Sequence, residues 1–174
     1  MNVLFINGTV GAGKTTTMDA VGVILRGAGV PHALIDLDGL RNAWPAPDDD
    51  PFNIRVAQIN LAAMSDTYRQ FGAQMLVVAG VLESLDQRDR CEAMIGSRMT
   101  VVRLRPYADA VRERLWHRQH RDEAERDWHL ERAGQLDGIL ETAQLDDAVV
   151  EVGRELPIEV AKKVLASAGF ADQG

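Results

Sequence analysis

With 174 residues, 46% of them hydrophobic and 26% charged, the chain has the length and balance of one ordinary globular domain. The net charge of −7 argues against a general nucleic-acid or anionic-membrane binder, since both need a basic surface. The sequence contains neither the roughly 18-residue apolar run of a membrane span nor a secretory signal pattern, and its single cysteine excludes an internal disulfide. We therefore expect a cytoplasmic protein, a monomer or homodimer, that forms one domain over 1–174.

Strands and helices are expected to alternate along the whole chain. Short apolar runs predict strands at 3–6, 33–35, 75–79, 99–104 and 148–152. Helical periodicity and end signals predict helices at 14–28, 54–71, 107–120 and 127–141, and a last one that begins at Pro157. The helix at 54–71 has the clearest apolar stripe, which ends at Phe71 and is expected to face the core. This alternation predicts an α/β protein of three layers, with a parallel sheet between two layers of helices.

The phosphate-binding signature G-x-x-x-x-G-K-[ST] occupies residues 8–15, between the first expected strand and helix. Its glycines let the backbone curl so that successive N–H groups point at phosphate oxygens, and the following helix adds positive charge from its N-terminus. The sequence therefore predicts a P-loop. The residues expected to contact the nucleotide here are Gly8, Thr9, Val10, Gly11, Ala12, Gly13, Lys14, Thr15 and Thr16.

Three side chains of the P-loop have individual expected roles. Lys14 is expected to reach the β- and γ-phosphates, the Thr15 hydroxyl to ligate Mg²⁺, and Thr16 to reach the α-phosphate. The guanine-recognition signature Asn-Lys-x-Asp is absent from the sequence, which disfavours a GTPase. The expected cofactors are therefore ATP and Mg²⁺.

Two carboxylates follow the second expected strand. In an open α/β sheet, ligands bind beyond the C-terminal ends of the strands, so Asp36 and Asp38 are expected to face the same crevice as the P-loop. Asp38 is interpreted as a catalytic base or substrate-orienting residue, with capping of a short helix at 39–43 as the alternative. Asp36 is interpreted as a magnesium-supporting or a structural residue. Arg41 is a candidate partner for an anionic group of the phosphate acceptor.

The third expected strand ends at Val78-Ala79-Gly80, where many P-loop proteins have an acidic residue that supports magnesium. Its absence leaves open whether Asp36 or Asp38 serves the metal and which of the two is the base.

Half of the arginines lie within residues 103–132, and phosphoryl transfer needs positive charge around the transferring group. On a helix, Arg114, Arg118 and Arg121 are spaced i, i+4 and i+7 and share one face. A break in the helical pattern indicates a mobile segment, which predicts a lid near 114–128. The alternative is an ordinary salt-bridged surface helix, because acidic residues are interspersed with these arginines.

These motifs resemble the small P-loop kinases that phosphorylate hydroxyl groups of metabolites or antibiotics, and the resemblance covers nearly the whole chain. The run at 35–41 is similar to the second-strand motif of adenylylsulfate kinases. Its continuation to Trp44-Pro45 is similar to chloramphenicol phosphotransferase, in which the matching carboxylate is the catalytic base, and this implies Asp38 here. The family's sheet order, 2-3-1-4-5, is implied as well.

The resemblance extends to the arginine-rich half of the chain. Residues 104–118 are similar to the fourth strand and the lid-entry helix of these kinases, which implies Arg118 as the lid arginine. Because Arg114, Arg118 and Arg121 share one helix face, at least one of them is expected to contact phosphate, and Arg114 is a candidate nucleotide contact. Residues 152–157 resemble the loop that packs on adenine, which implies a nucleotide contact for Arg154.

Two functional hypotheses follow. The first is a kinase that transfers the γ-phosphate of ATP to a hydroxyl of a small molecule, whose identity the sequence does not give. The second is a nucleotide-dependent ATPase or switch that acts on a macromolecular partner and lacks an acceptor pocket. The acidic residue after the second strand, together with the arginine-rich segment, favours the kinase.

Overall fold

The computed structural model describes residues 1–107 and 134–170. Five strands form one sheet in the order β2-β3-β1-β4-β5, and every neighbouring pair is parallel. The strands are β1 (Asn2–Gly8), β2 (His32–Asp36), β3 (Met75–Ala79), β4 (Met99–Pro106) and β5 (Ala148–Val152). The expected parallel sheet and its strand order are confirmed, although β1, β2 and β4 are each longer than their apolar runs.

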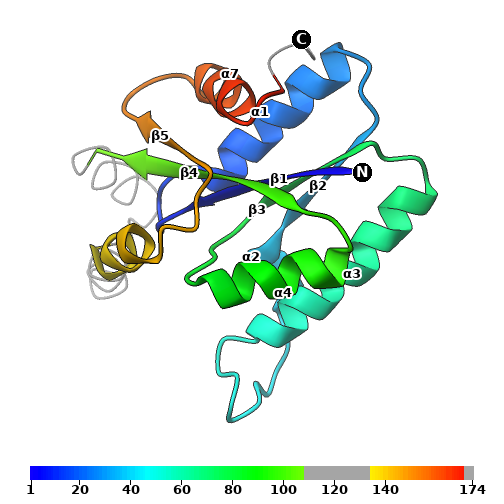
Figure 1. Ribbon diagram of the computed structural model, residues 1–174, viewed down its shortest axis with the longest axis vertical. Coiled ribbons are helices and arrows are strands. Elements are labelled where there is room, and N and C mark those ends of the chain that lie inside the picture. The colour runs from blue at the N-terminus through cyan, green and yellow to red at the C-terminus, as the bar shows by residue number, and fades with distance from the viewer. Residues whose placement is uncertain (108–133, 171–174) are drawn as a thin grey trace.

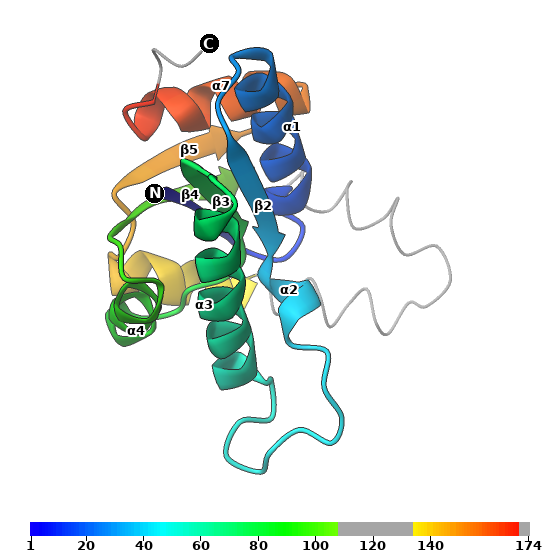
Figure 2. The ribbon, with the colours of Figure 1, turned by 90° about the vertical axis from the view of Figure 1, so that its right-hand side faces the viewer.

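Helices cover both faces of this sheet (Figures 1 and 2). One face carries α1 (Lys14–Gly27) and α7 (Pro157–Ser167), and the other carries α3 (Ile54–Gln70) and α4 (Leu85–Ile95). The short α2 (Leu37–Leu40) follows β2 directly, and residues 134–143 are helical. Among the described residues, no helix has both the length and the apolar character that a membrane crossing requires.

The core consists of two hydrophobic clusters, one on each face of the sheet. In β1, Leu4 and Ile6 belong to the cluster beneath α1 and α7, whereas Val3 and Phe5 belong to the cluster beneath α3 and α4. Successive residues of a strand point to opposite faces, so a strand buried on both sides must be apolar throughout. All five residues of β3 are buried for the same reason.

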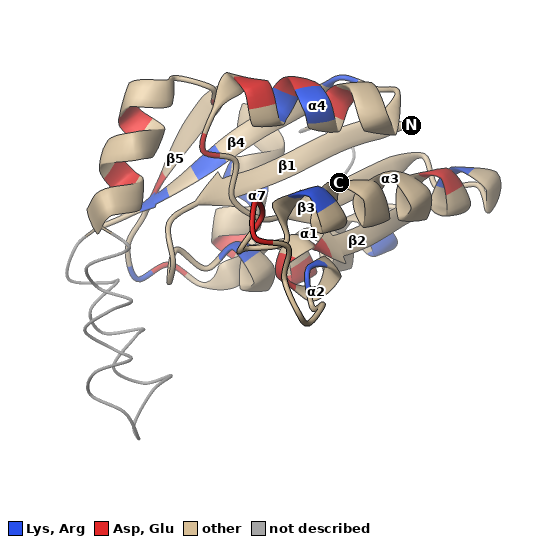
Figure 3. Cartoon of the chain, turned by 90° about the horizontal axis from the view of Figure 1, so that it is seen from below, with Lys and Arg blue, Asp and Glu red and all other residues tan. Residues whose placement is uncertain are grey.

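The helix α4 was not given a range by the sequence pattern. Five of its eleven residues are charged, and acidic and basic residues are interspersed along it (Figure 3). Its two buried residues, Cys91 and Ile95, are too few to produce a periodic stripe. Its boundaries come instead from Ser84, whose hydroxyl accepts a hydrogen bond from the backbone N–H of Gln87, and from Gly96 after its last turn.

One expected core residue is exposed. Phe71 follows the end of α3, and 86% of its surface is accessible to solvent. The predicted apolar stripe of 54–71 runs one residue beyond α3, which ends at Gln70, so helical periodicity does not apply to Phe71. The expected helix at 107–120 and the first part of that at 127–141 fall outside the described residues.

Candidate active site

The P-loop has the predicted context, because it connects the end of β1 to the start of α1. Gly8, Gly11 and Gly13 have φ angles of 146°, 76° and 90°, which residues with a side chain rarely adopt. At Gly8 the requirement is also steric, since a Cβ atom would lie 2.7 Å from the carbonyl oxygen of Leu104. The glycines of the signature are therefore needed for the path of the backbone.

Lys14 is the first residue of α1, and its side chain turns back over the loop. Its ammonium group donates hydrogen bonds to the carbonyl oxygens of Gly8, at 3.0 Å, and Thr9, at 2.9 Å. Gly13, the residue before α1, has no side chain to cap the first backbone N–H groups of the helix. A helix start of this kind, next to a positive charge, is suited to phosphate.

Asp36, the last residue of β2, connects α2 to the P-loop. Its Oδ2 atom accepts a 2.7 Å hydrogen bond from the Thr15 hydroxyl, and its Oδ1 atom accepts one of 2.9 Å from the backbone N–H of Asp38. Asp36 has extended backbone angles and is therefore the N-cap of α2. The alternative in which Asp38 caps a helix at 39–43 is wrong, because α2 begins earlier and contains Asp38.

Asp38 lies on α2 with its side chain exposed, and it forms an ion pair with Arg41. The carboxylate oxygen Oδ1 of Asp38 lies 2.6 Å from a guanidinium nitrogen of Arg41, and the two side chains are 62% and 39% exposed. Gly80, just beyond β3, lets α2 pack closely, since a Cβ atom there would lie 2.6 Å from a methyl carbon of Leu37. Asp38 therefore lies beyond the ends of two neighbouring strands, as predicted.

A magnesium site can be tested against these residues. Within 1–107 and 134–170, no group of three or more His, Cys, Asp and Glu residues could enclose a metal ion. A hydroxyl and a carboxylate in contact, as in Thr15 and Asp36, fit an ion that takes few protein ligands and is held mostly by water and phosphate, which is typical of Mg²⁺.

The loop between α2 and α3 is fixed by its own side chains. Asn53 donates hydrogen bonds to the carbonyl oxygens of Arg41 and Ala43, both at 2.9 Å. The carboxylate of Asp50 accepts from the first two backbone N–H groups of α3. Trp44, in the same loop, is 94% exposed. The loop therefore holds an aromatic side chain in solvent on an anchored backbone.

Arg154 lies in the exposed turn after β5, the segment that resembles an adenine-contacting loop. The next residue, Glu155, accepts hydrogen bonds from the backbone N–H of Gly153, at 2.6 Å, and from Lys163 on α7, at 2.7 Å. The bond from Lys163, aided by backbone hydrogen bonds, lowers the pKa of Glu155 to about 2. These contacts fix the turn that contains Arg154.

The expected lid near 114–128, with Arg114, Arg118 and Arg121, lies outside the described residues. Arg103, which begins the same arginine-rich stretch, is on β4 and only 5% exposed. It pairs with Glu141 at 2.7 Å and with Asp146 at 3.3 Å. The high count of arginines in this stretch therefore includes at least one that serves a buried ion pair.

The sequence interpretation missed Asn7, a fully buried polar residue directly before the P-loop. Its side chain bonds to Leu82 and to Asp146, which are far from it in the chain. The available signal was an asparagine at the end of an otherwise apolar strand. Its partners could not be inferred without the fold.

No protein-family model and no curated protein matches the sequence. Among solved structures, the tunicamycin resistance protein of Deinococcus radiodurans is similar with a TM-score of 0.66 and 20% identity, over 97% of this chain and 96% of that one.

Two kinases are also similar in structure. Shikimate kinase from Acinetobacter baumannii, in complex with shikimate, has a TM-score of 0.64 and 15% identity, over 95% of this chain and 91% of that one. The APS kinase of Mycobacterium tuberculosis, in complex with AMPPNP and APS, has a TM-score of 0.61 and 18% identity, over 97% of both chains. The chain therefore has the fold of the small P-loop kinases.

Proposed function

We propose that the protein is an ATP-dependent phosphotransferase that moves the γ-phosphate of ATP to a hydroxyl group of a small molecule. The observation that carries this proposal is one juxtaposition: a P-loop lies beside the end of β2, where Asp36 contacts the P-loop threonine and Asp38 is exposed. A nucleotide site with an exposed carboxylate beside it is what transfer to a hydroxyl requires.

The P-loop and Asp36 hold the nucleotide in this proposal. The backbone N–H groups of residues 8–13 and the ammonium group of Lys14 bind the phosphate oxygens, and Lys14 leaves the carbonyl groups that it now contacts. Thr15 and Asp36 hold the magnesium ion, which neutralises phosphate charge when it is bound. Arg154 contacts the base of the nucleotide from the turn after β5.

Asp38 acts on the acceptor. Its carboxylate accepts the proton of the acceptor hydroxyl while that oxygen bonds to the γ-phosphorus and the bond from phosphorus to the leaving ADP oxygen breaks. Asp36 is the less suitable base, because both of its oxygens already accept hydrogen bonds. Arg41 balances the charge of Asp38 in the absence of acceptor and contacts an anionic group of the acceptor in its presence.

The arginines of the expected lid complete the proposal. Arg118 neutralises charge on the transferring phosphoryl group, and Arg114 or Arg121 contacts the nucleotide phosphates. The spacing of the three arginines on one helix face supports these roles, and the resemblance to small P-loop kinases supports that of Arg118.

The experiment compares ATP turnover with and without a metabolite extract from which macromolecules have been removed. A small-molecule kinase should form ADP quickly only when the extract is present, and Asp38→Asn should lose this stimulation. A switch or ATPase should turn over at the same rate without the extract and should respond to a macromolecular fraction instead. Fractionation of the active extract then identifies the acceptor.

A further inference from the structure

The strand that leads into the P-loop has unequal neighbours. The register of β1 with β4 continues to the pairs Asn7–Arg103 and Gly8–Leu104. On the other side, the register of β1 with β3 stops at Ile6–Ala79. At Asn7 and Gly8, β1 therefore pairs with β4 but no longer with β3.

On the side where β1 no longer pairs with β3, the side chain of Asn7 makes hydrogen bonds with the backbone of Leu82. Its amide nitrogen donates to the carbonyl oxygen of Leu82, at 3.3 Å, and its amide oxygen accepts from the backbone N–H of Leu82, at 3.1 Å. The side chain thus supplies Leu82 with one acceptor and one donor, as a paired backbone does in an antiparallel hydrogen-bonded pair. They hold the segment that leaves β3 alongside the start of the P-loop.

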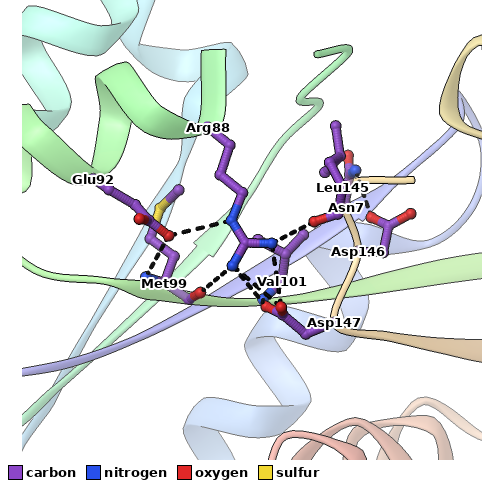
Figure 4. A network of polar contacts seen from close by, with 8 residues as sticks. All are labelled: Asn7, Arg88, Glu92, Met99, Val101, Leu145, Asp146 and Asp147. Carbon is purple, nitrogen blue, oxygen red and sulfur yellow. Dashed lines mark hydrogen bonds and ion pairs between the residues drawn. The ribbon is translucent and has the colours of Figure 1, made fainter. Parts of the chain in front are cut away.

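A second contact anchors Asn7 from the turn before β5. The amide nitrogen also donates to the carboxylate of Asp146, at 3.0 Å (Figure 4). The side chains of Asp146 and of its partner Arg103 are each only 5% exposed. The side chain of Asn7 therefore makes three hydrogen bonds, two with Leu82 and one with Asp146, and Asn7 is fully buried. Such a residue has one available geometry.

The neighbouring carboxylate, Asp147, belongs to a different set of contacts in the same view (Figure 4). It pairs with Arg88 of α4 at 3.0 Å and accepts from the backbone N–H of Val101 at 2.8 Å. Arg88 also contacts Glu92 and the carbonyl oxygen of Met99. Arg88 also donates to the carbonyl oxygen of Leu145, so this set ties α4 both to the start of β4 and to the loop before β5 (Figure 4).

We propose that Asn7 is a positioning residue for the P-loop. Its side chain sets where Gly8 begins the loop relative to the segment at Leu82. The P-loop binds phosphate through backbone N–H groups, and hydrogen bonds weaken steeply when their angle changes, so a shift of its first residue affects all of them. The inference rests on the proposed nucleotide binding.

The test compares Asn7→Ala with Arg88→Met. Both substitutions remove several buried polar contacts, so both should lower the melting temperature. The second measurement is the dissociation constant for Mg-AMPPNP, by calorimetry at a temperature where circular dichroism shows every variant to be folded. We expect Asn7→Ala to weaken binding at least about tenfold, roughly 1.4 kcal/mol, and Arg88→Met to leave it within about twofold of wild type.

A second variant keeps the proposal testable if Asn7→Ala does not fold. Asp146→Asn preserves the size of the side chain and leaves both bonds between Asn7 and Leu82, so a smaller loss of affinity is expected, about threefold. Unchanged affinity in Asn7→Ala, or in Asp146→Asn where Asn7→Ala does not fold, would overturn the inference and make Asn7 a residue of stability only, as would an equal loss in Arg88→Met. Failure of the wild-type protein to bind Mg-AMPPNP would instead overturn the proposed function.

Discussion

In the P-loop, the groups that we propose to bind the ligand are backbone N–H groups and one lysine, whereas at the end of β2 they are the side chains of Asp38 and Arg41. The P-loop glycines adopt φ angles that few other residues can, and the loop is packed against β4. Asp38 and Arg41 are exposed and contact each other. Substitution of most P-loop residues leaves the backbone groups in place, whereas one substitution at the end of β2 changes its chemistry.

This difference explains why one half of the site is easier to interpret than the other. Phosphate is the same in every nucleotide, so a fixed backbone cradle with a fixed glycine spacing serves them all. Acceptors differ in shape and charge, and exposed side chains on a short helix can differ with them. Under the proposed function, the nature of the acceptor would therefore be encoded in a few positions around Asp38, without a spacing that can be recognised.

The largest expected effect is that of Lys14→Ala. Lys14 is partly exposed and belongs to neither core cluster, so its removal should leave the fold intact while it removes the charge expected to face the phosphates. Wild-type protein at 100 times its dissociation constant for Mg-ATP should gain about 2.7 kcal/mol of stability, visible as a higher melting temperature. We expect this gain and all phosphoryl transfer to be lost in the variant.

The matched control for Lys14→Ala is Lys162→Ala, which removes an exposed lysine from α7. It should retain both the shift in melting temperature and the turnover. Normal turnover in Lys14→Ala would contradict the assignment of the P-loop.

The second effect distinguishes the two carboxylates. Asp38→Asn preserves size but removes the charge, and we expect turnover to fall at least about a hundredfold, the usual scale for loss of a general base. The affinity for Mg-ATP should be nearly unchanged, because Asp36 and not Asp38 contacts Thr15. Measurement of both quantities in Asp38→Asn and Asp36→Asn checks this. A collapse of Mg-ATP affinity in Asp38→Asn would exchange the two roles.

A smaller effect is expected of Arg41→Gln, which removes the partner of Asp38. Exposed ion pairs contribute about 0–1 kcal/mol, so the melting temperature should change by less than about 4 °C. Mg-ATP affinity should not change, since Arg41 lies on the acceptor side. The KM for an anionic acceptor should rise at least about tenfold, from loss of a charge-assisted hydrogen bond. An acceptor KM equal to that of wild type would leave Arg41 as a surface residue.

The central strands could be predicted because they are buried on both faces and are therefore continuous apolar runs, as in 75–79, whereas the edge strands β2 and β5 bury alternate residues. The strand order came from the resemblance to small P-loop kinases, and not from the runs themselves. The helix α4 could not be bounded, because it buries too few residues to give a period, and the burial of Phe71 was predicted wrongly. A local sequence pattern therefore bounds an element well where burial follows a regular pattern along it, as in β3, and poorly where few residues are buried, as in α4.

For the site, the P-loop was predictable because one contiguous segment contains the whole motif. The contact between Thr15 and Asp36 joins residues that are 21 positions apart, and that between Asn7 and Asp146 joins residues that are 139 apart. Such pairs depend on which strands lie side by side, and residue spacing carries no information on them. The sequence alone therefore leaves the roles of Asp36 and Asp38 open, and their hydrogen bonds support the assignment proposed above.

The smallest expected effect concerns the turn after β5, which the side chains of Glu155 and Lys163 stabilise and which we propose contacts the nucleotide base. Glu155 has a pKa of about 2 in the folded protein, below the ordinary value of 4.5, because Lys163 donates a hydrogen bond to it. A carboxyl with a depressed pKa favours the folded state above pH 4.5, and this contribution is lost as the pH falls from about 4.5 towards 2. The pair is exposed, so the contribution is small.

Glu155→Gln should therefore melt slightly below wild type at pH 7, and the two melting temperatures should converge as the pH is lowered from about 4.5 towards 2. Thermal melts across this range, with Lys163→Gln as the second member of the pair, provide the measurement. Wild type and Glu155→Gln should bind inorganic triphosphate equally, because the P-loop backbone is the same in both. Glu155→Gln should bind ATP more weakly than wild type if the turn contacts the nucleotide base. A difference in melting temperature that does not depend on pH would mean that the carboxylate charge of Glu155 does not stabilise the turn.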